Sequence, residues 1–312
     1  MITKLVESAG SDLGSRWVSA LFAPAALFWM LGGLAWSWAV GWDDALDSVE
    51  DWVANLSTAD AVLVALAGLA VLTVSEQLGR IFTLPLLRLL EGYWPRPIRW
   101  LLRPGTGAQR RYRERLDEEF QALAEKVYEQ EATAAEERRF AVVDNKLARF
   151  PTDPAPTMPT AFGNVMLAAE TRPTDRYGID VVRTWPHLWL VLPEAARTEL
   201  AASRNNLNTV GTTVGFVGLS ALWGAVAWPA VPVALLGSYA VYRAALVPAA
   251  RHYGDLIEAV VDLYHRELYS ALKLRAPRSP AHDRELGSFV TTYLWRGDTR
   301  NEHIFVDDEG RS

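Results

Sequence analysis

The residues with the most varied chemistry lie between Asn164 and Trp189. Two predicted helices flank this segment, which combines carboxylates, guanidinium groups, a phenol, an imidazole and two indoles. Such groups could form hydrogen bonds and ion pairs with a ligand or stack on it, and binding residues often collect in connections between rigid elements. The candidate binding residues are Asn164, Asp175, Arg176, Tyr177, Asp180, Trp185, His187 and Trp189.

A structural role for the same segment is the simpler alternative. Arg176 and Arg183 could pair with Asp180. The aromatic side chains of Tyr177, Trp185 and Trp189 would then pack a helical domain against the inner surface of a membrane. Substitution of the charged residues separates the two interpretations, because a structural pair affects folding and a ligand contact does not.

No catalytic constellation accompanies these residues. The sequence has no glycine-rich phosphate loop, no His-Glu-x-x-His helix and no Gly-x-Ser-x-Gly turn. It has no cysteine, which excludes cysteine nucleophiles, disulfides and iron–sulfur clusters, and its five histidines are scattered. We therefore predict that the protein is not an enzyme and has no catalytic residue and no cofactor.

One helical face has the spacing of a metal site. Asp255, Glu258, Asp262 and His265 recur about one turn apart and could converge on an ion. The polar face of an amphipathic helix has the same pattern, and no second helix offers matching ligands. The prediction is that no metal binds here.

An uncharged run from Asn205 to Tyr242 dominates the chain and is long enough to cross a bilayer twice. Trp228-Pro229 and Pro232 interrupt it at its middle, which indicates a hairpin whose tip reaches the far surface. Pro193 suits the first turn of the helix that enters this run.

Two earlier apolar runs, Val18–Val40 and Ala61–Gly79, predict a first hairpin, and the first run is too long for a signal peptide. No Lys or Arg lies between Arg16 and Arg80, while acidic residues crowd the loop between the two runs. This loop is therefore expected to face outside and to contain a short amphipathic helix.

Candidate polar residues within the spans are Glu76, Arg80, Asn208 and Thr212. Glu76 and Arg80 lie one turn apart, as in an interfacial ion pair, although an ionisable residue in a span is also a functional candidate. Asn208 and Thr212 could line a vestibule, but hydrogen bonds between helices are the plainer explanation. Gly211 beside them predicts close helix packing, together with Gly215.

Basic and aromatic residues alternate in Ile81–Arg103, a composition that suits the inner surface of a membrane with anionic lipids. Its prolines, from Pro85 to Pro104, forbid one long helix. Simple anchoring and specific lipid recognition both remain open. The predicted lipid-facing basic residues are Arg88, Arg96, Arg99 and Arg103.

The other segments predict a helical domain. Ala108–Phe150 has an apolar stripe that indicates a long helix, broken near Thr133 and packed on its own domain. Pro151–Pro159 indicates an extended linker, after which Thr160 would cap a short helix, Ala161–Glu170.

Three short motifs stand out in and after this linker: Pro159-Thr160…Gly163-Asn164, Arg176-Tyr177-Gly178-Ile179-Asp180 and Trp185-Pro186…Leu188-Trp189. Through them, the chain from about Thr160 to the uncharged run resembles a family of uncharacterised bacterial multi-span membrane proteins. The resemblance implies a class of protein and no particular activity.

These patterns predict an all-α fold in which a four-span transmembrane bundle of two helical hairpins has a cytosolic helical domain. The expected parts are a first hairpin with an acidic outer loop (1–80), an inner-surface interfacial segment (81–104), the cytosolic domain (105–204), the second hairpin (205–250), and a cytosolic helix and tail (251–312).

The preferred function is that of a non-enzymatic protein of the bacterial inner (plasma) membrane, with both termini in the cytoplasm. Its cytosolic helical domain would bind a partner or signal at the inner membrane surface. A homo-oligomeric ion channel or pore, gated by this domain, is the alternative. The lipid bilayer, anionic lipids and further copies of the chain are the expected partners, and the net charge of −6 argues against nucleic acid.

Overall fold

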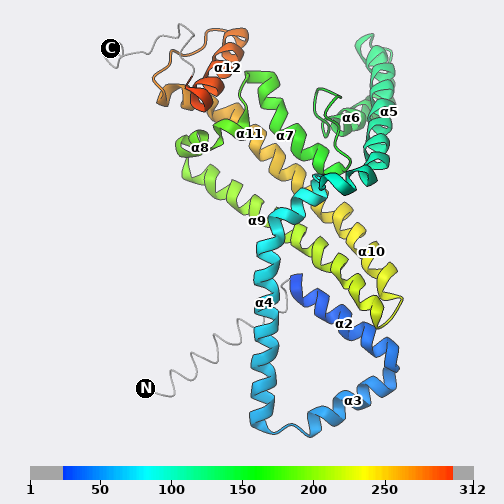
Figure 1. Cartoon of the computed structure of the whole chain (residues 1–312). Helices are drawn as coiled ribbons and strands as arrows, with labels where there is room; N and C mark the ends of the chain where they lie inside the picture. Colours follow the sequence, from blue (N-terminus) through cyan, green and yellow to red (C-terminus); the bar gives the residue numbers. More distant parts are fainter. Residues whose placement is uncertain (1–23, 298–312) are drawn as a thin grey trace. The chain divides into compact units, whose positions relative to one another are not determined.

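The computed structural model describes residues 24–297, which are helical with connecting turns and contain no strand (Figure 1). The predicted all-α class is therefore confirmed. The described chain divides into two compact units. Unit 1 contains the residues up to Leu87 together with Asn208–Leu246, and unit 2 contains Arg88–Leu207 together with the residues from Val247 onward.

Unit 1 begins with a bent helix pair, α2 (Pro24–Val40) and α3 (Trp42–Ala54). The axes differ by 114°, and Gly41 provides the bend with a φ of 107°, a conformation that favours glycine. The predicted amphipathic helix after the first apolar run is thus present as α3. Residues 18–23 of the predicted first span lie outside the described part.

The next helix, α4 (Thr58–Glu91), is capped as predicted, because the amide of Asp60 donates to Ser57 Oγ at 3.2 Å and the amide of Ser57 donates to Asp60 Oδ2 at 3.3 Å. It continues through Pro85, so the expectation of an interruption there is wrong. Proline removes one backbone hydrogen bond, whereas ending the helix would leave several more groups unpaired.

Helix α9 (Glu194–Leu219) packs closely on α4 in unit 1. A Cβ placed on Gly211 would lie 2.5 Å from Leu87 Cδ2, and one on Gly215 would collide with Leu86. The hydroxyl oxygens of Thr83 and Thr212 are 2.9 Å apart in the same contact. The predicted glycine face therefore exists, and α4 is the helix that approaches it.

After α9 come a 3₁₀ turn (Ser220–Ala225) and a continuous helix of 42 residues. The continuous helix consists of α10 (Ala230–Val241), a π-helical turn (Tyr242–Leu246) and α11 (Val247–Ala271). In unit 1, Ser238 of α10 donates to the carbonyl oxygen of Val214 of α9 at 3.0 Å.

Two described helices are long and apolar enough to cross a membrane, namely α4 and the continuous helix Ala230–Ala271. The bent pair α2–α3 is a third if it forms one span. The four predicted spans also included α9, which is not among these helices in the described chain. Its first half is charged, and its uncharged half is rich in Asn, Thr and Gly.

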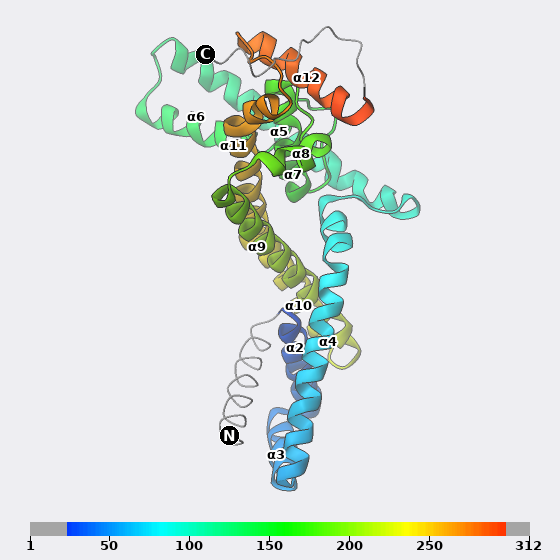
Figure 2. The same ribbon diagram turned by 90° about the vertical axis from the view of Figure 1, so that its left-hand side faces the viewer.

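Unit 2 contains a helical hairpin of α5 (Arg103–Tyr128) and α6 (Ala134–Leu147), seen side by side in Figure 2. Thr133 forms a capping box with Glu136 at the start of α6, so the predicted break is confirmed. Leu116 and Val143 are buried between the two helices. As predicted, the apolar stripe packs within its own unit.

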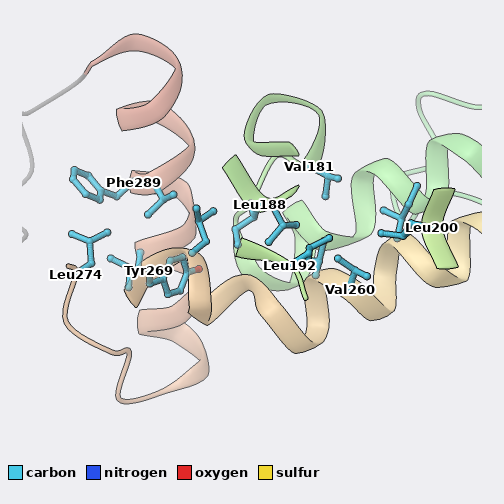
Figure 3. Packing of buried hydrophobic residues seen from close by; sticks show 14 residues of the cluster. Val181, Leu188, Leu192, Leu200, Val260, Tyr269, Leu274 and Phe289 are labelled. Atoms are coloured by element: carbon cyan, nitrogen blue, oxygen red, sulfur yellow. The ribbon is translucent and has the colours of Figure 1, made fainter. Parts of the chain in front are cut away.

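The main core of unit 2 joins α7 (Ala161–Tyr177), α8 (Val181–Val191), the first half of α9, α11 and α12 (Pro280–Arg296). Figure 3 shows Leu188 and Leu192 against Val260, and Tyr269 near Phe289. Helix α7 is longer than its predicted range because it passes through Pro173 and ends only at Gly178, whose φ is 72°.

Candidate functional site

The first motif connects the beginning of α7 to the end of α4. The hydroxyl of Thr160 accepts from the amide of Gly163 at 2.9 Å and donates to the carbonyl oxygen of Glu91 at 3.0 Å. Asn164 is buried. Its side-chain oxygen accepts a hydrogen bond from the backbone amide of Met158 at 2.7 Å, and its side-chain nitrogen donates to the carbonyl oxygen of Met158 at 3.0 Å. Asn164 therefore closes a loop inside the domain.

The second motif turns the chain from α7 into α8. Gly178 allows the reversal, and Ile179 enters the core at 1% exposure. Asp180 caps α8 by accepting from the amide of Arg183 at 3.1 Å, and the two side chains form an ion pair at 3.2 Å. The backbone amide of Asp180 donates a 3.1 Å hydrogen bond to the hydroxyl of Thr291, which connects this turn to α12.

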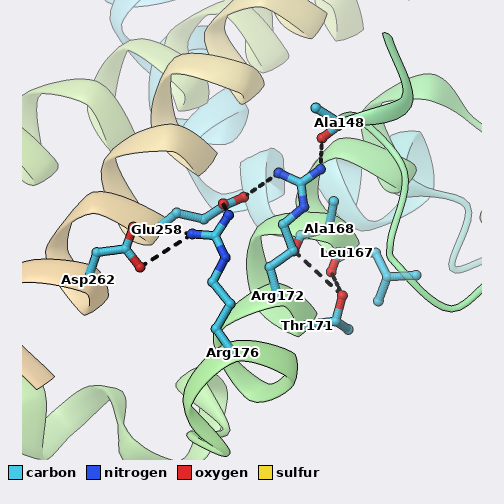
Figure 4. Close-up of polar contacts among 8 residues, drawn as sticks. All are labelled: Ala148, Leu167, Ala168, Thr171, Arg172, Arg176, Glu258 and Asp262. Atoms are coloured by element: carbon cyan, nitrogen blue, oxygen red, sulfur yellow. Dashed lines mark hydrogen bonds and ion pairs between the residues drawn. The ribbon is translucent and has the colours of Figure 1, made fainter. Parts of the chain in front are cut away.

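Ion pairs join α7 to α11, as Figure 4 shows. Arg176 pairs with Asp262 at 3.2 Å, and Arg172 pairs with Glu258 at 2.9 Å and also donates to the carbonyl oxygen of Ala148. Of the two pairs expected with Asp180, the structure contains the one with Arg183, whereas Arg176 takes acidic partners on another helix. These residues act as cross-links within unit 2.

Residues of the α11 face that resembled a metal site take part in ion pairs, stacking and hydrogen bonds within unit 2. Tyr177 stacks on His265, with ring centroids 4.3 Å apart. The two ring nitrogens of His265 lie 2.7 Å from the carbonyl oxygen of Val261 and 3.2 Å from a carboxylate oxygen of Asp283. Within residues 24–297, no three His, Asp or Glu residues are arranged as metal ligands.

Asp283 is the most enclosed carboxylate of this network, with 2% exposure. Arg266 donates to it at 2.9 Å in addition to the contact with His265. Burial raises the pKa of Asp283, but the hydrogen bonds from Arg266 and His265 outweigh this effect and place the pKa below its usual value. The ionised carboxylate is therefore a stabilising part of the fold.

Trp185 and Trp189 line an open recess of about 730 Å³ between α8, α9 and α11. Their rings are 6.1 Å apart between centroids, and the guanidinium of Arg204 lies 5.4 Å from the ring centroid of Tyr253. The recess therefore offers aromatic surfaces beside a cation. It is lined by Trp185, Pro186, Trp189, Leu190, Leu200, Ala201, Arg204, Asn205 and Tyr253, which we call the aromatic recess.

The aromatic recess contains two of the eight predicted binding residues. Asp175 and His187 are exposed outside it, and the other four take part in the turns and cross-links described above. Sequence reasoning missed Arg204 and Tyr253. Arg204 lies near the middle of α9 and Tyr253 lies within α11, and no sequence signal places them next to Trp189.

The predicted intramembrane residues are all in unit 1 and belong to α4 and α9. Glu76 lies 3.9 Å from Arg80, whose side chain is largely exposed. The hydroxyl of Thr212 donates to the carbonyl oxygen of Asn208 at 2.8 Å. Within residues 24–297, Oε2 of Glu76 and Oδ1 of Asn208 are buried without a hydrogen-bond partner.

Three of the four predicted lipid-facing arginines come together. Arg96, Arg99 and Arg103 line a recess of about 1030 Å³ with Arg110, whereas Arg88 lies in the last turn of α4 and does not line it. The first two belong to a 3₁₀ helix, η1 (Arg96–Leu102), which leads directly into α5. We call this recess the basic pocket.

The chain matches no protein-family model, and comparison with curated proteins and with solved structures reveals no significant similarity. The resemblance to bacterial multi-span proteins thus stays a prediction. The residues and geometry described above are the basis of the functional argument.

Proposed function

We propose that the protein is a non-enzymatic integral membrane protein whose helical domain recognises a partner or signal at the inner surface of the cell membrane. The proposed anchor consists of four spans in two hairpins, with both termini and the helical domain in the cytoplasm. Two to three helices of sufficient length and apolarity support the anchor, and the absence of Lys and Arg between Arg16 and Arg80 supports its orientation.

The observation that carries the recognition role is the aromatic recess. Its volume of about 730 Å³ falls in the range of small-molecule and peptide-anchor sites, about 300–1,000 Å³. Aromatic side chains next to an arginine are the residue types that dominate binding energy at interfaces. Trp185, Trp189 and Arg204 thus supply stacking and a charge in one place.

A pair of photo-crosslinking positions tests this role in intact cells. Leu190 lines the aromatic recess and is 77% exposed, while Val182 is 64% exposed on the same helix but does not line it. We expect a photoreactive residue at position 190 to give a discrete adduct that is lost in the Arg204→Gln background. The same adduct pattern from both positions would refute the recess as the site.

Cysteine labelling tests the orientation, because the chain has no native cysteine. Ser48 of α3 and Ala141 of α6 are both exposed. In intact cells, Ser48→Cys should react with an impermeant reagent and Ala141→Cys should react only after permeabilisation. Protection of Ser48→Cys, with reaction of Ala141→Cys, would reverse the proposed topology.

A gated homo-oligomeric pore is the second candidate, and the unpartnered oxygens of Glu76 and Asn208 favour it. Glu76 lies in α4, a candidate span, and Asn208 lies in α9, a further span of the proposed anchor. Polar atoms without partners in such helices would mark a route for ions when several subunits share it. Liposomes with the purified protein should then conduct cations, and Glu76→Gln should reduce the current. An equal current from wild type and variant, or none from either, would remove this candidate.

A further inference from the structure

We infer that the basic pocket is a binding site for a phosphate group. Arginine recognises phosphate through two parallel hydrogen bonds, which gives both affinity and geometric fit. Four arginines line the pocket, Arg96, Arg99, Arg103 and Arg110, and no lining residue is acidic. The pocket is separate from the aromatic recess and has its own ligand.

These four arginines lack the counter-charges that several arginines elsewhere in unit 2 possess. Arg172, Arg176 and Arg266 each pair with a carboxylate. Among residues 24–297, no carboxylate forms an ion pair with any arginine of the basic pocket. In a protein with a net charge of −6, such a concentration of unpaired positive charge is suited to an anionic ligand.

The backbone holds the arginines of η1 in a fixed relation. A 3₁₀ helix has about three residues per turn, so side chains three positions apart lie directly above one another. Arg96 and Arg99 therefore share one face, and the ring of Pro97 between them restricts the backbone. The two like charges repel each other, and a bound anion relieves this repulsion.

Helix α5 also contributes residues to the pocket lining. Thr106 and Gly107, near the start of α5, line the pocket. Arg110 follows within the same helix and also lines the pocket.

The segments that line the basic pocket are packed closely against one another. Gly92 has a φ of 109°, and any Cβ at this position would collide with Pro159, another lining residue. A Cβ on Gly105 would lie only 2.9 Å from the carbonyl oxygen of Pro159. Because the end of α4, the start of α5 and the Pro159 loop are packed this closely, the pocket needs little ordering when it binds.

The phosphate could belong to a phospholipid headgroup or to a soluble molecule. Tyr93, Trp94 and Trp100 line the pocket, and such residues are enriched at the headgroup level of membranes. Lipid as the source rests on the proposed membrane insertion. The binding of free phosphate in detergent does not depend on it.

Two variants of neighbouring arginines provide the test. Arg110 lines the pocket, while Arg111 is also exposed but does not line it, so Arg110→Gln and Arg111→Gln remove the same charge from adjacent positions. The full chain is placed in phosphatidylcholine nanodiscs with or without phosphatidic acid, and bound phosphatidic acid is measured by native mass spectrometry. Inorganic phosphate is titrated calorimetrically into the detergent-solubilised chain.

We expect Arg110→Gln to weaken binding by about tenfold and Arg111→Gln to leave it within about twofold of wild type. Binding of phosphatidic acid alone identifies a lipid headgroup, and binding of inorganic phosphate identifies a soluble source. Equal effects of the two variants, or no binding of either probe by a folded wild-type chain, would overturn the inference. The crosslinking at Leu190 reports on the other recess, so failure here is distinct from failure of the proposed function.

Discussion

The hydroxyl of Thr160 donates a 3.0 Å hydrogen bond to the carbonyl oxygen of Glu91, the last residue of α4, while it caps α7. One oxygen thus satisfies an orphan group at the end of one helix and at the start of another. Thr160→Val should destabilise the protein by about 1–2 kcal/mol. Thr160→Ser keeps the hydroxyl and should restore most of the loss in thermal melts of the detergent-solubilised chain.

A second prediction concerns the close contact between the start of α7 and the end of α4. A Cβ on Gly163 would overlap the carbonyl oxygen of Glu91, so Gly163→Ala should cost about 1–3 kcal/mol through forced backbone shifts. Gly107 is also helical, but no atom lies within 4 Å of the point where its Cβ would be, and Gly107→Ala should stabilise α5 by about 0.5–1 kcal/mol. The change in the free energy of unfolding should therefore have opposite signs for the two variants.

The contact between α4 and α9 predicts that Gly211→Leu will disrupt unit 1. The new side chain would enter the space of Leu87, whose Cδ2 lies 2.5 Å from the position of a Cβ. Gly33→Leu is the matched control, because nothing lies within 4 Å of that Cβ. Size-exclusion profiles and melting temperatures should change only for Gly211→Leu, and unchanged values for it would exclude this packing.

Glu170 should respond to pH in the opposite way to most carboxylates. Burial raises its pKa, and Asp180 raises it further, while Arg204 lowers it. The folded pKa therefore exceeds the unfolded value, so the stabilising contribution is complete below the unfolded pKa and is lost as the pH rises through the folded pKa. Glu170→Gln should raise the melting temperature at neutral pH, and this gain should vanish in acid below about pH 4.

Asp283 provides the reverse case. Its folded pKa is lowered despite burial, so its contribution is present above the unfolded pKa and is lost as the pH falls through the folded pKa. Asp283→Asn should cost about 3 kcal/mol at neutral pH, because the buried His265 loses its charged partner. The difference between variant and wild type should shrink progressively below about pH 4, as followed by melts in a pH series.

Local signals in the sequence predicted the elements that depend on neighbouring residues. Ser57 with Asp60, Thr133 with Glu136 and Thr160 with Gly163 form caps whose partners lie three positions away, and each begins a helix where expected. The small residues of α9 likewise predicted a close contact, because glycine spacing alone defines a smooth helix face.

Features that depend on distant partners could not be predicted. Pro85 and Pro173 lie within helices because the surrounding turns remain paired, which a proline in isolation does not indicate. Arg176 takes its acidic partner from α11, and Tyr253 joins Trp189 from another helix. Both relationships arise from tertiary packing between segments far apart in the chain.

The α5–α6 hairpin has a consequence for how unit 2 responds to its solution. Two exposed ion pairs, Lys126 with Glu136 and Arg139 with Glu119, connect the two helices above a small buried cluster. The hydrogen bond from Lys126, with those from Thr133, lowers the pKa of Glu136 to about 2, so moderate acid leaves this pair ionised. At molar concentration, salt shortens the screening length for exposed charges to about 3 Å, so exposed ion pairs weaken. The same salt strengthens apolar packing. Salt, rather than moderate acid, is therefore the condition that weakens these two ion pairs, while the buried apolar cluster beneath them continues to hold α6 on α5.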